Sequence, residues 1–164
     1  MKKMLSLVIF AAMVLFSCQL QPKENTFSMN GAVQKGPFQL GSTVTIQEVD
    51  KKLNPTGRMY YTTTKDDFGS FNLANKFSSQ FVEVTSEGFY FDECANNTAS
   101  AKISLRSYGD LSLNTPLNLN ILTTIAHGRI KTLVDNGKDF AQACNQAESE
   151  LLAVLGFSGV PGLH

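Results

Sequence analysis

The chain has 164 residues, of which 43% are hydrophobic and 17% charged, and its formal net charge is +0. This length suits one domain, or one domain with a short appendage, and the apolar content is sufficient for a packed core. Nucleic-acid binding relies on a concentrated basic surface, which a chain of balanced charge and low charge density does not offer. The composition therefore argues against a nucleic-acid partner.

The first 17 residues have the organisation of a signal peptide. Lys2 and Lys3 supply positive charge, and residues 4–16 follow without a charged side chain. As a helix this run would span roughly 20 Å, which is short of the ~30 Å hydrocarbon core of a bilayer. We therefore predict that residues 1–17 are a signal peptide rather than a membrane-spanning helix.

The sequence Leu15-Phe16-Ser17-Cys18 resembles the lipobox of bacterial lipoproteins. In that family the cysteine sulfur receives a diacylglyceryl group, the peptidase cuts before the cysteine, and the new amino group is commonly acylated. The resemblance implies a palmitate-type membrane anchor at Cys18, and stable anchoring requires more than one acyl chain. An ordinary signal peptide and a cysteine buried at the end of a helix are the alternatives. Gln19, which is not Asp, implies sorting to the outer membrane of the cell envelope.

Residues 18–27 are rich in polar side chains and include Pro22, Lys23 and Glu24. Such a segment suits a flexible, solvated tether between a lipid anchor and a folded domain. Without the two lysines of the signal peptide, the mature chain has 12 basic and 14 acidic residues, a net charge of −2.

Short runs of alternating apolar and polar residues follow the tether, at residues 42–49, 58–64, 70–74, 80–86 and 100–107. Val44 and Ile46, for example, lie on one face of the first run, and this period of two is typical of half-buried strands. Turn residues separate the runs at 36–37, 54–57, 66–69 and 96–97. No helix-bearing crossover occurs between them, which disfavours a parallel sheet. We predict that residues 28–113 form a small antiparallel β-sandwich.

The segments GAVQKGPFQLGSTVTI, TTTKDDFGSFNL and VEVTSEGFY resemble the carboxypeptidase regulatory-like domain, a β-sandwich of transthyretin (prealbumin) type. The resemblance covers residues 29–90, about two-fifths of the chain. The matching positions are Gly36, Gly41, Thr64, Asp66, Gly69, Phe71, Gly88 and Phe89. It implies a passive module with no catalytic residues of its own, found beside peptidases, transporters and surface proteins.

The turn in the second segment has a folding role for each of its key residues. We expect Asp66 to accept hydrogen bonds from the turn's own amides, Gly69 to adopt a positive φ, and Phe71 to point into the core. Asp66 and Asp67 also suit calcium as paired carboxylates, but the loop lacks further oxygen ligands at regular spacing. We therefore predict turn capping and no metal ion.

The apolar period changes to 3.6 residues in the tail, residues 114–164. The first predicted helix has Asn120 as N-cap and Asn136-Gly137 as its stop, and the second runs from Asp139 to Gly156. Their predicted apolar faces contain Leu122, Ile125, Ala126, Ile130, Leu133 and Val134, and Phe140, Cys144, Ala147, Leu151, Val154 and Leu155. The short link predicts an antiparallel helical hairpin.

This tail also resembles, more loosely, the longer helical region that follows a regulatory-like sandwich in larger bacterial lipoproteins. Two amphipathic helices bury one face each, so they need the sandwich or a third helix as a partner. A natural short form, a truncated product and one half of an obligate partnership all remain open.

Few residues of the predicted folded part suggest chemistry. His127 has no accompanying Ser/His/Asp order or Gly-x-Ser-x-Gly elbow, and we predict that it lies on a helix surface without a catalytic role. Cys94 and Cys144 either form a disulfide between the sandwich and the second helix or remain free, buried thiols. No Cys/His cluster has zinc spacing, and no cofactor is expected.

Two further groups of side chains are open to a binding interpretation. The acidic group comprises Glu83, Glu87, Asp92 and Glu93, and we expect solvated strand ends and loops rather than a paired-carboxylate site. The aromatic run Phe89–Phe91 suggests a carbohydrate-stacking platform, but we expect at least two of its rings to pack in the core.

Together these features favour a non-enzymatic, lipid-anchored, extracytoplasmic module of a bacterial envelope with a structural or interaction role. Its expected partners are the membrane, through Cys18, and an envelope protein or glycan. Two alternatives remain: an accessory subunit of an envelope polysaccharide- or peptide-processing system, and an adhesin-like binding module that uses exposed aromatic residues.

Overall fold

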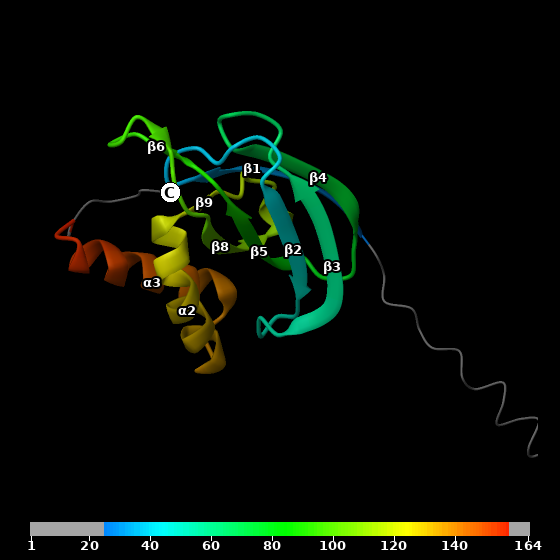
Figure 1. Ribbon diagram of the computed structural model, residues 1–164. Coiled ribbons are helices and arrows are strands. Elements are labelled where there is room, and N and C mark those ends of the chain that lie inside the picture. Colours follow the sequence, from blue (N-terminus) through cyan, green and yellow to red (C-terminus); the bar gives the residue numbers. More distant parts are fainter. Residues whose placement is uncertain (1–24, 158–164) are drawn as a thin grey trace, which may run out of the picture.

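The computed structural model describes residues 25–157, so the predicted signal peptide and Cys18 lie outside the described residues. This part of the chain is mainly β and ends in two helices (Figure 1). Its elements are β1 (Asn25–Gln34), β2 (Thr43–Val49), β3 (Pro55–Thr63), β4 (Ser70–Phe77), β5 (Phe81–Gly88), β6 (Phe91–Asp92), β7 (Asn97–Thr98), β8 (Ile103–Asp110), η1 (Leu111–Leu113), β9 (Leu119–Asn120), α2 (Ile121–Asp135) and α3 (Phe140–Val154).

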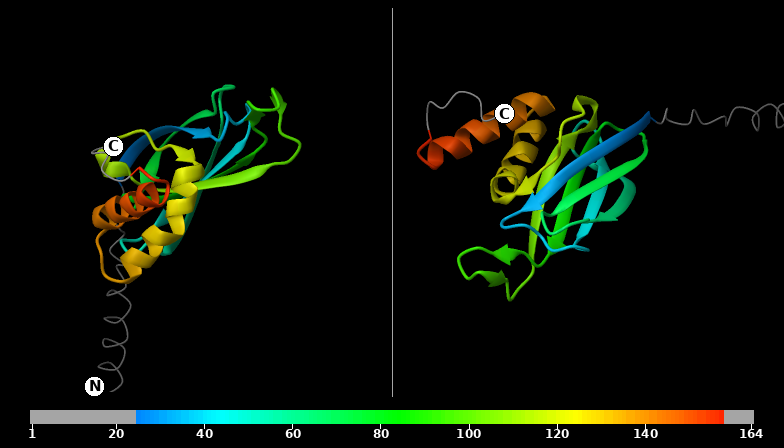
Figure 2. Two further views of the ribbon diagram at one scale, coloured as in Figure 1. Left: turned by 90° about the vertical axis from the view of Figure 1, so that its left-hand side faces the viewer. Right: turned by 90° about the horizontal axis from the view of Figure 1, so that it is seen from above.

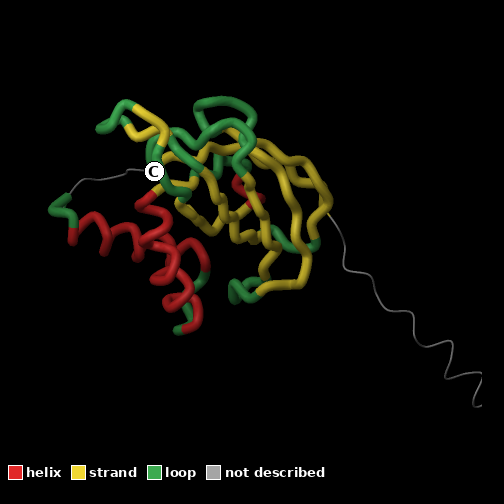
Figure 3. The backbone as a smooth tube through the Cα atoms, viewed as in Figure 1, coloured by secondary structure: helices red, strands yellow, loops and turns green. Residues whose placement is uncertain are grey.

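Two sheets share one apolar core. The four-stranded sheet has the order β3-β2-β5-β8 and is antiparallel throughout, while the three-stranded sheet has the order β4-β1-β9. The short β6–β7 hairpin projects from one end (Figure 3). The β1–β9 pair is parallel, with Val33 opposite Leu119. The predicted antiparallel arrangement therefore has one exception, the two-residue parallel pairing of β9 with β1. It forms because the chain, after passing through the other strands, returns at β9 to lie beside β1.

The core between the sheets follows from the alternation of apolar residues. Val44 and Ile46 of β2 are fully buried, and so are Val82 and Val84 of β5, as the period of two predicts. We call this cluster the inter-sheet core: Met29, Val33, Phe38, Val44, Ile46, Phe71, Phe77, Val82, Val84, Leu105, Leu111, Leu117 and Leu119.

A β-bulge breaks the alternation at the end of β2, between Gln47 and Val49. Because of it, both Glu48 and Val49 are fully buried. The Glu48 carboxylate accepts hydrogen bonds from Thr56 Oγ1 at 3.2 Å and from the Ser78 amide at 2.9 Å. A buried carboxylate needs such donors, and these two connect β2 to the start of β3 and the end of β4.

The turn after β2 differs from the one predicted at residues 54–57. It lies at residues 50–54, and β3 already begins at Pro55. Asp50 Oδ1 accepts hydrogen bonds from the amides of Lys52 (2.8 Å) and Asn54 (2.9 Å). Leu53 adopts a φ of 60° there and is buried, so contacts beneath the helices stabilise a backbone conformation that leucine rarely adopts.

Both helices begin as the sequence predicts. Asn120 accepts a hydrogen bond from the Thr123 amide and Thr123 Oγ1 accepts one from the Asn120 amide, each at 2.9 Å, which completes a capping box. Asp139 caps α3 by accepting a hydrogen bond from the Gln142 amide at 2.8 Å. The stop after α2 is also confirmed, because Gly137 has a φ of +92°.

The helices pack on the outer face of the four-stranded sheet (Figure 2, left). We call their shared apolar contact the helix–sheet cluster: Val49, Leu53, Ala126, Ile130, Leu133, Val134, Ala143 and Ala147. Phe81 of β5 and Phe140 of α3 adjoin it, with ring centroids 5.2 Å apart.

The predicted apolar faces of the helices are only partly buried. Leu122 and Ile125 of α2 are 45% and 57% exposed, and Val154 at the end of α3 is 85% exposed. One reason is a groove of about 390 Å³ between the helices, lined by Leu122 on one side and Leu151 and Leu152 on the other. Each helix therefore buries its apolar face fully only in the part that packs against the sheet.

Candidate functional site

Three segments meet at the end of the β domain that lies opposite the start of β1, which is blue in Figure 2 (right). Residues 34–41 lie between the turn at residues 66–69 and the segment 89–91. The Val33 amide donates to the Gly69 carbonyl at 3.0 Å, and the Gln39 amide to the Phe89 carbonyl at 3.0 Å. The Phe91 amide completes the connection by donating to the Pro37 carbonyl at 2.9 Å. We call this region the loop end; its backbone is held by hydrogen bonds on both sides.

Glycines allow these segments to approach closely. A Cβ atom on Gly36 would lie 2.0 Å from the Phe91 carbonyl oxygen, and one on Gly88 would lie 2.3 Å from Ser42 Oγ. Gly69 has a φ of +73°, and a Cβ atom there would lie 2.3 Å from the Val33 carbonyl oxygen. Larger residues would push the segments apart, so these three glycines are requirements of the loop end.

The expected role of Asp66 in the turn is confirmed. Its Oδ1 accepts hydrogen bonds from the Ser70 amide at 2.9 Å and the Phe68 amide at 3.0 Å, and these bonds lower the pKa of the carboxyl group. Phe71 is buried in the inter-sheet core, also as expected. Thr64 adds a cross-connection, because its Oγ1 donates to the Gln39 carbonyl at 2.6 Å and accepts from the Ser42 amide at 2.9 Å.

Four large apolar side chains are exposed on this rigid support. Phe68 is 72% exposed, Leu40 63%, Phe91 40% and Phe89 36%. The expectation that at least two rings of Phe89–Phe91 pack in the core is therefore wrong, because only Tyr90 packs against it. Successive residues of an extended backbone point to opposite sides, so the residues on either side of Tyr90 face solvent.

Two adjoining hollows lie among these side chains. The first, of about 330 Å³, is lined by Pro37, Gln39, Asp67, Phe68 and Phe91. The second, of about 250 Å³, shares Gln39 and is bordered by Leu40, Glu87, Phe89 and Lys102. Sequence reasoning did not identify Phe68 as a surface residue. The signal was its place inside the tight Asp-Asp-Phe-Gly turn, because a side chain there is too far from the core to be buried in it.

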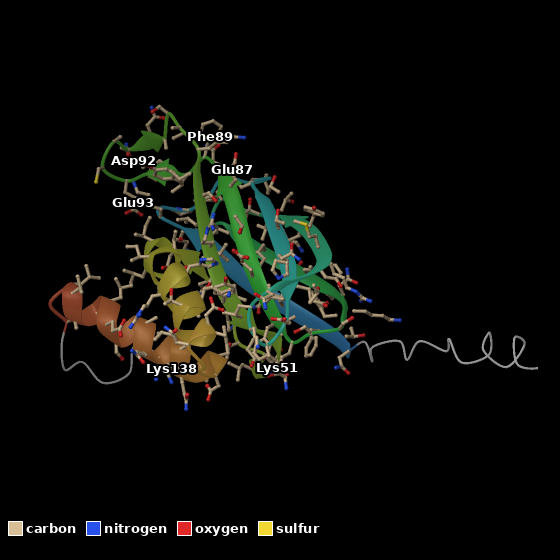
Figure 4. All side chains as sticks on the ribbon, turned by 90° about the horizontal axis from the view of Figure 1, so that it is seen from below. Lys51, Glu87, Phe89, Asp92, Glu93 and Lys138 are labelled. Carbon is tan, nitrogen blue, oxygen red and sulfur yellow. The ribbon has the colours of Figure 1, made fainter. Side chains whose placement is uncertain are left out.

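The acidic group of the sequence is divided by the fold. Figure 4 shows Glu87, Asp92 and Glu93 near Phe89 at the loop end, with Lys51 and Lys138 at the opposite end of the molecule. Glu83 lies instead under α2, where its Oε1 is 2.8 Å from His127 Nε2. The four carboxylates therefore do not form one site.

His127 faces the sheet, so its prediction as a helix-surface residue is wrong. Its side chain is 13% exposed, and its ring stacks on Tyr108 with a centroid distance of 4.2 Å and an interplanar angle of 9°. Nε2 has no partner other than Glu83 among the described residues. His127 follows Ala126 and precedes Ile130 by three residues, so it lies at the edge of the buried face of α2. This spacing is present in the sequence and could have predicted its partial burial.

The environment of this pair changes the titration of its neighbours. The hydrogen bond from His127 lowers the pKa of Glu83, and the positive charge of Arg106 adds to this effect. Burial raises the pKa of Tyr108 to about 12, and the negative charge of Glu83 contributes further.

A general acid–base pair acts on a bound group, usually together with a nucleophile. The helix hydroxyls nearest the pair are engaged otherwise, since Thr123 Oγ1 and Thr124 Oγ1 both donate to the Asn120 carbonyl, at 3.0 and 2.7 Å. The arrangement of Glu83, His127 and Tyr108 therefore suits attachment of α2 to the sheet.

Both cysteines in the described part of the chain are free. Cys94 is exposed in the β6–β7 hairpin, which differs from the expected buried thiol, while Cys144 is half-buried in α3. Burial raises the pKa of the Cys144 thiol to about 12, which makes it a poor nucleophile.

Residues 25–157 contain no group of three or more His, Cys, Asp or Glu side chains arranged to hold a metal ion. Within the same residues, no helix is both long and apolar enough to cross a membrane. No known protein family, curated protein or solved structure matches the chain. Its function is therefore inferred from the residues and their geometry.

Proposed function

We propose that the protein is a lipid-anchored, non-catalytic interaction module of a bacterial cell envelope. The observation that carries this proposal is the sequence Leu15-Phe16-Ser17-Cys18 at the end of an uncharged run, followed by a polar segment. The anchor would be attached to Cys18, and the first described strand, β1, begins shortly afterwards, at Asn25. By the same proposal, Gln19 directs the protein to the outer membrane.

The geometry of β1 supports an interaction role. This strand has ten residues, so it extends for roughly 33 Å from Asn25 toward the loop end. A domain held at Cys18 would therefore present the loop end away from the bilayer. The glycines and hydrogen bonds of the loop end hold the backbone that carries its exposed side chains, which lowers the backbone entropy lost on binding.

We assign the β domain to the carboxypeptidase regulatory-like type, with a transthyretin-like sandwich. Support comes from the motif residues, because Gly36 and Gly69 stand at close backbone contacts, Gly88 lies against the Ser42 side chain, and Asp66 caps its turn. Each of these positions has a mechanical reason for its residue type. A passive role is consistent with the packing of Glu83 and His127 against each other under α2.

An adhesin-like role is the second candidate, and the exposure of Phe68, Phe89 and Phe91 favours it. Exposed apolar residues that gather in one place, with polar groups around them, mark interaction sites on protein surfaces. This candidate is compatible with a lipid anchor at Cys18, because Cys18 precedes β1 in the chain and the loop end follows it.

Metabolic labelling with an alkyne fatty-acid analogue tests the anchor. We expect label and membrane association in the wild type, loss of both in Cys18→Ala, and retention of both in the control Cys94→Ala, which removes an exposed thiol. An unlabelled wild type, or a Cys18→Ala variant that is still labelled, would refute the anchor.

A further inference from the structure

We infer that the loop end binds a neutral oligosaccharide, with one pyranose ring seated in the hollow lined by Phe68 and Phe91. This inference rests on the proposed interaction role and names the class of partner. It depends on three properties of the loop end: the exposed rings, the polar groups beside them, and the size of the two hollows.

The aromatic rings supply the stacking surfaces. The faces of an aromatic ring are electronegative, and the C–H groups of a pyranose carry partial positive charge, so the two surfaces attract. Phe68 and Phe91 both line the first hollow, and they are 72% and 40% exposed. Their backbones are held by the Asp66 turn and by the bond from the Phe91 amide to Pro37, so little order is lost when a ligand binds.

The polar groups in the same hollow match hydroxyl donors. Asp67 has no hydrogen-bond or ion-pair partner within the described part of the chain, and its carboxylate is an acceptor. Gln39 donates from Nε2 to Thr98 Oγ1 at 2.7 Å, which leaves its amide oxygen as a second acceptor. A sugar offers several hydroxyl donors on one ring, and these can satisfy both acceptors while its C–H face meets the phenyl rings.

The charges disfavour other occupants. An apolar peptide would bury the Asp67 carboxylate without supplying hydrogen-bond donors to its oxygens, and burying an unpaired carboxylate is unfavourable. Lys35 and Lys102 also lie at this end of the molecule, but the carboxylates of Asp67, Glu87, Asp92 and Glu93 outnumber them, so an anionic membrane surface would be repelled (Figure 4). The same carboxylates would repel acidic sugars, so a neutral chain fits best.

The dimensions favour more than one sugar ring. The first hollow, about 330 Å³, is at the lower limit of ordinary ligand sites. The second hollow of about 250 Å³ shares Gln39 with it and adds Phe89, whose ring has Lys102 Nζ 5.6 Å from its centroid. A chain of linked sugars could contact both hollows in succession.

The test measures binding of the full-length chain, in detergent, to hexasaccharides of β-glucan, α-glucan, mannan, xylan and chitin, with hexagalacturonate as the acidic probe. We expect at least one neutral probe to bind and hexagalacturonate to bind more weakly. Phe68→Ala and Phe91→Ala should each weaken the neutral probe at least tenfold, and Asp67→Asn by a smaller factor. Tyr61→Ala is the matched control, because Tyr61 is a 64% exposed ring on β3, outside both hollows, and its removal should leave binding unchanged.

Several outcomes would overturn the inference. These are absence of binding to every neutral probe, an equal loss in Tyr61→Ala and Phe91→Ala, and a stronger response to hexagalacturonate or to anionic phospholipid vesicles. Phe91→Tyr, which keeps the ring, should bind, and thermal melts should show that all variants fold. Cys18→Ala should bind glycan as the wild type does, because the loop end does not include the anchor. A wild-type chain that is unlabelled in the fatty-acid experiment and still binds sugar supports this site and refutes only the anchor.

Discussion

The inter-sheet core and the helix–sheet cluster differ in how completely they exclude water. Eight of the thirteen residues of the inter-sheet core are 0% exposed, whereas only Val49 and Ala143 of the eight residues of the helix–sheet cluster are 0% exposed. The helix–sheet cluster is also bordered by the Glu83–His127 pair and by the groove between the helices. The comparison indicates that the sheets have a closed core of their own and that the helices are attached to it by a smaller, more open contact.

The largest expected effect comes from opening the inter-sheet core. Phe77 contacts Tyr60 at a ring-centroid distance of 4.5 Å and Phe27 at 6.3 Å, so Phe77→Ala leaves a cavity between the sheets. We expect the free energy of unfolding to fall by about 3–5 kcal/mol, measured by urea titration with circular dichroism. Phe157→Ala is the control, since this ring is 55% exposed, and it should change the free energy by less than about 0.5 kcal/mol. Similar losses in both variants would contradict a closed inter-sheet core.

A smaller and more local effect is expected in the helix–sheet cluster. Leu133 is 4% exposed there, and Leu133→Ala should lower the free energy of unfolding by about 2 kcal/mol. Native-state hydrogen exchange should become faster in α2 and α3 while the amides of β2 and β5 keep their protection. The control is Ile125→Ala on the same helix, where the side chain is 57% exposed. If β2 exchanges faster to the same degree as α2, the two clusters form one cooperative unit and the comparison fails.

The sequence predicted most of what depends on local pattern. Alternation in β2 and β5 identified the buried valines, and the N-caps Asn120 and Asp139 were identified from residue type and spacing. It missed features that depend on distant contacts. The bulge at Gln47–Val49 and the unusual φ of Leu53 depend on packing against helices about 70 residues or more further along the chain.

The candidate site shows the same limit. The motif around Asp66, Gly69 and Gly88 predicted the framework of the loop end, because turn chemistry is local. The exposure of Phe68 and Phe91 was not predicted, since it depends on which face of each segment meets residues 34–41. His127 was misplaced for a similar reason: its helix periodicity put it on a boundary, and Tyr108 and Glu83 across the interface decide its burial.

The smallest expected effect concerns the polar border of the helix–sheet cluster. The pKa of Glu83 is lower in the folded protein than in the unfolded chain, so the unfolded chain binds more protons between the two values. The stabilisation from this carboxylate is therefore complete above the ordinary pKa of a glutamate, about 4.3, and is lost as the pH falls through the lower folded value. Glu83→Gln should lower the free energy of unfolding by about 1 kcal/mol at pH 7, and the difference from wild type should shrink as the pH falls below about 4.

Urea titrations of both proteins between pH 7 and pH 3 measure this difference, with Glu87→Gln as the control. Glu87 lies on the same strand and is exposed at the loop end, so its variant should follow the wild type at every pH. A Glu83→Gln difference that stays constant over this range would mean that the contact acts through shape and stacking on Tyr108. A difference that disappears at low pH would instead show that one charge, contributed by β5, helps to hold α2 on the sheet.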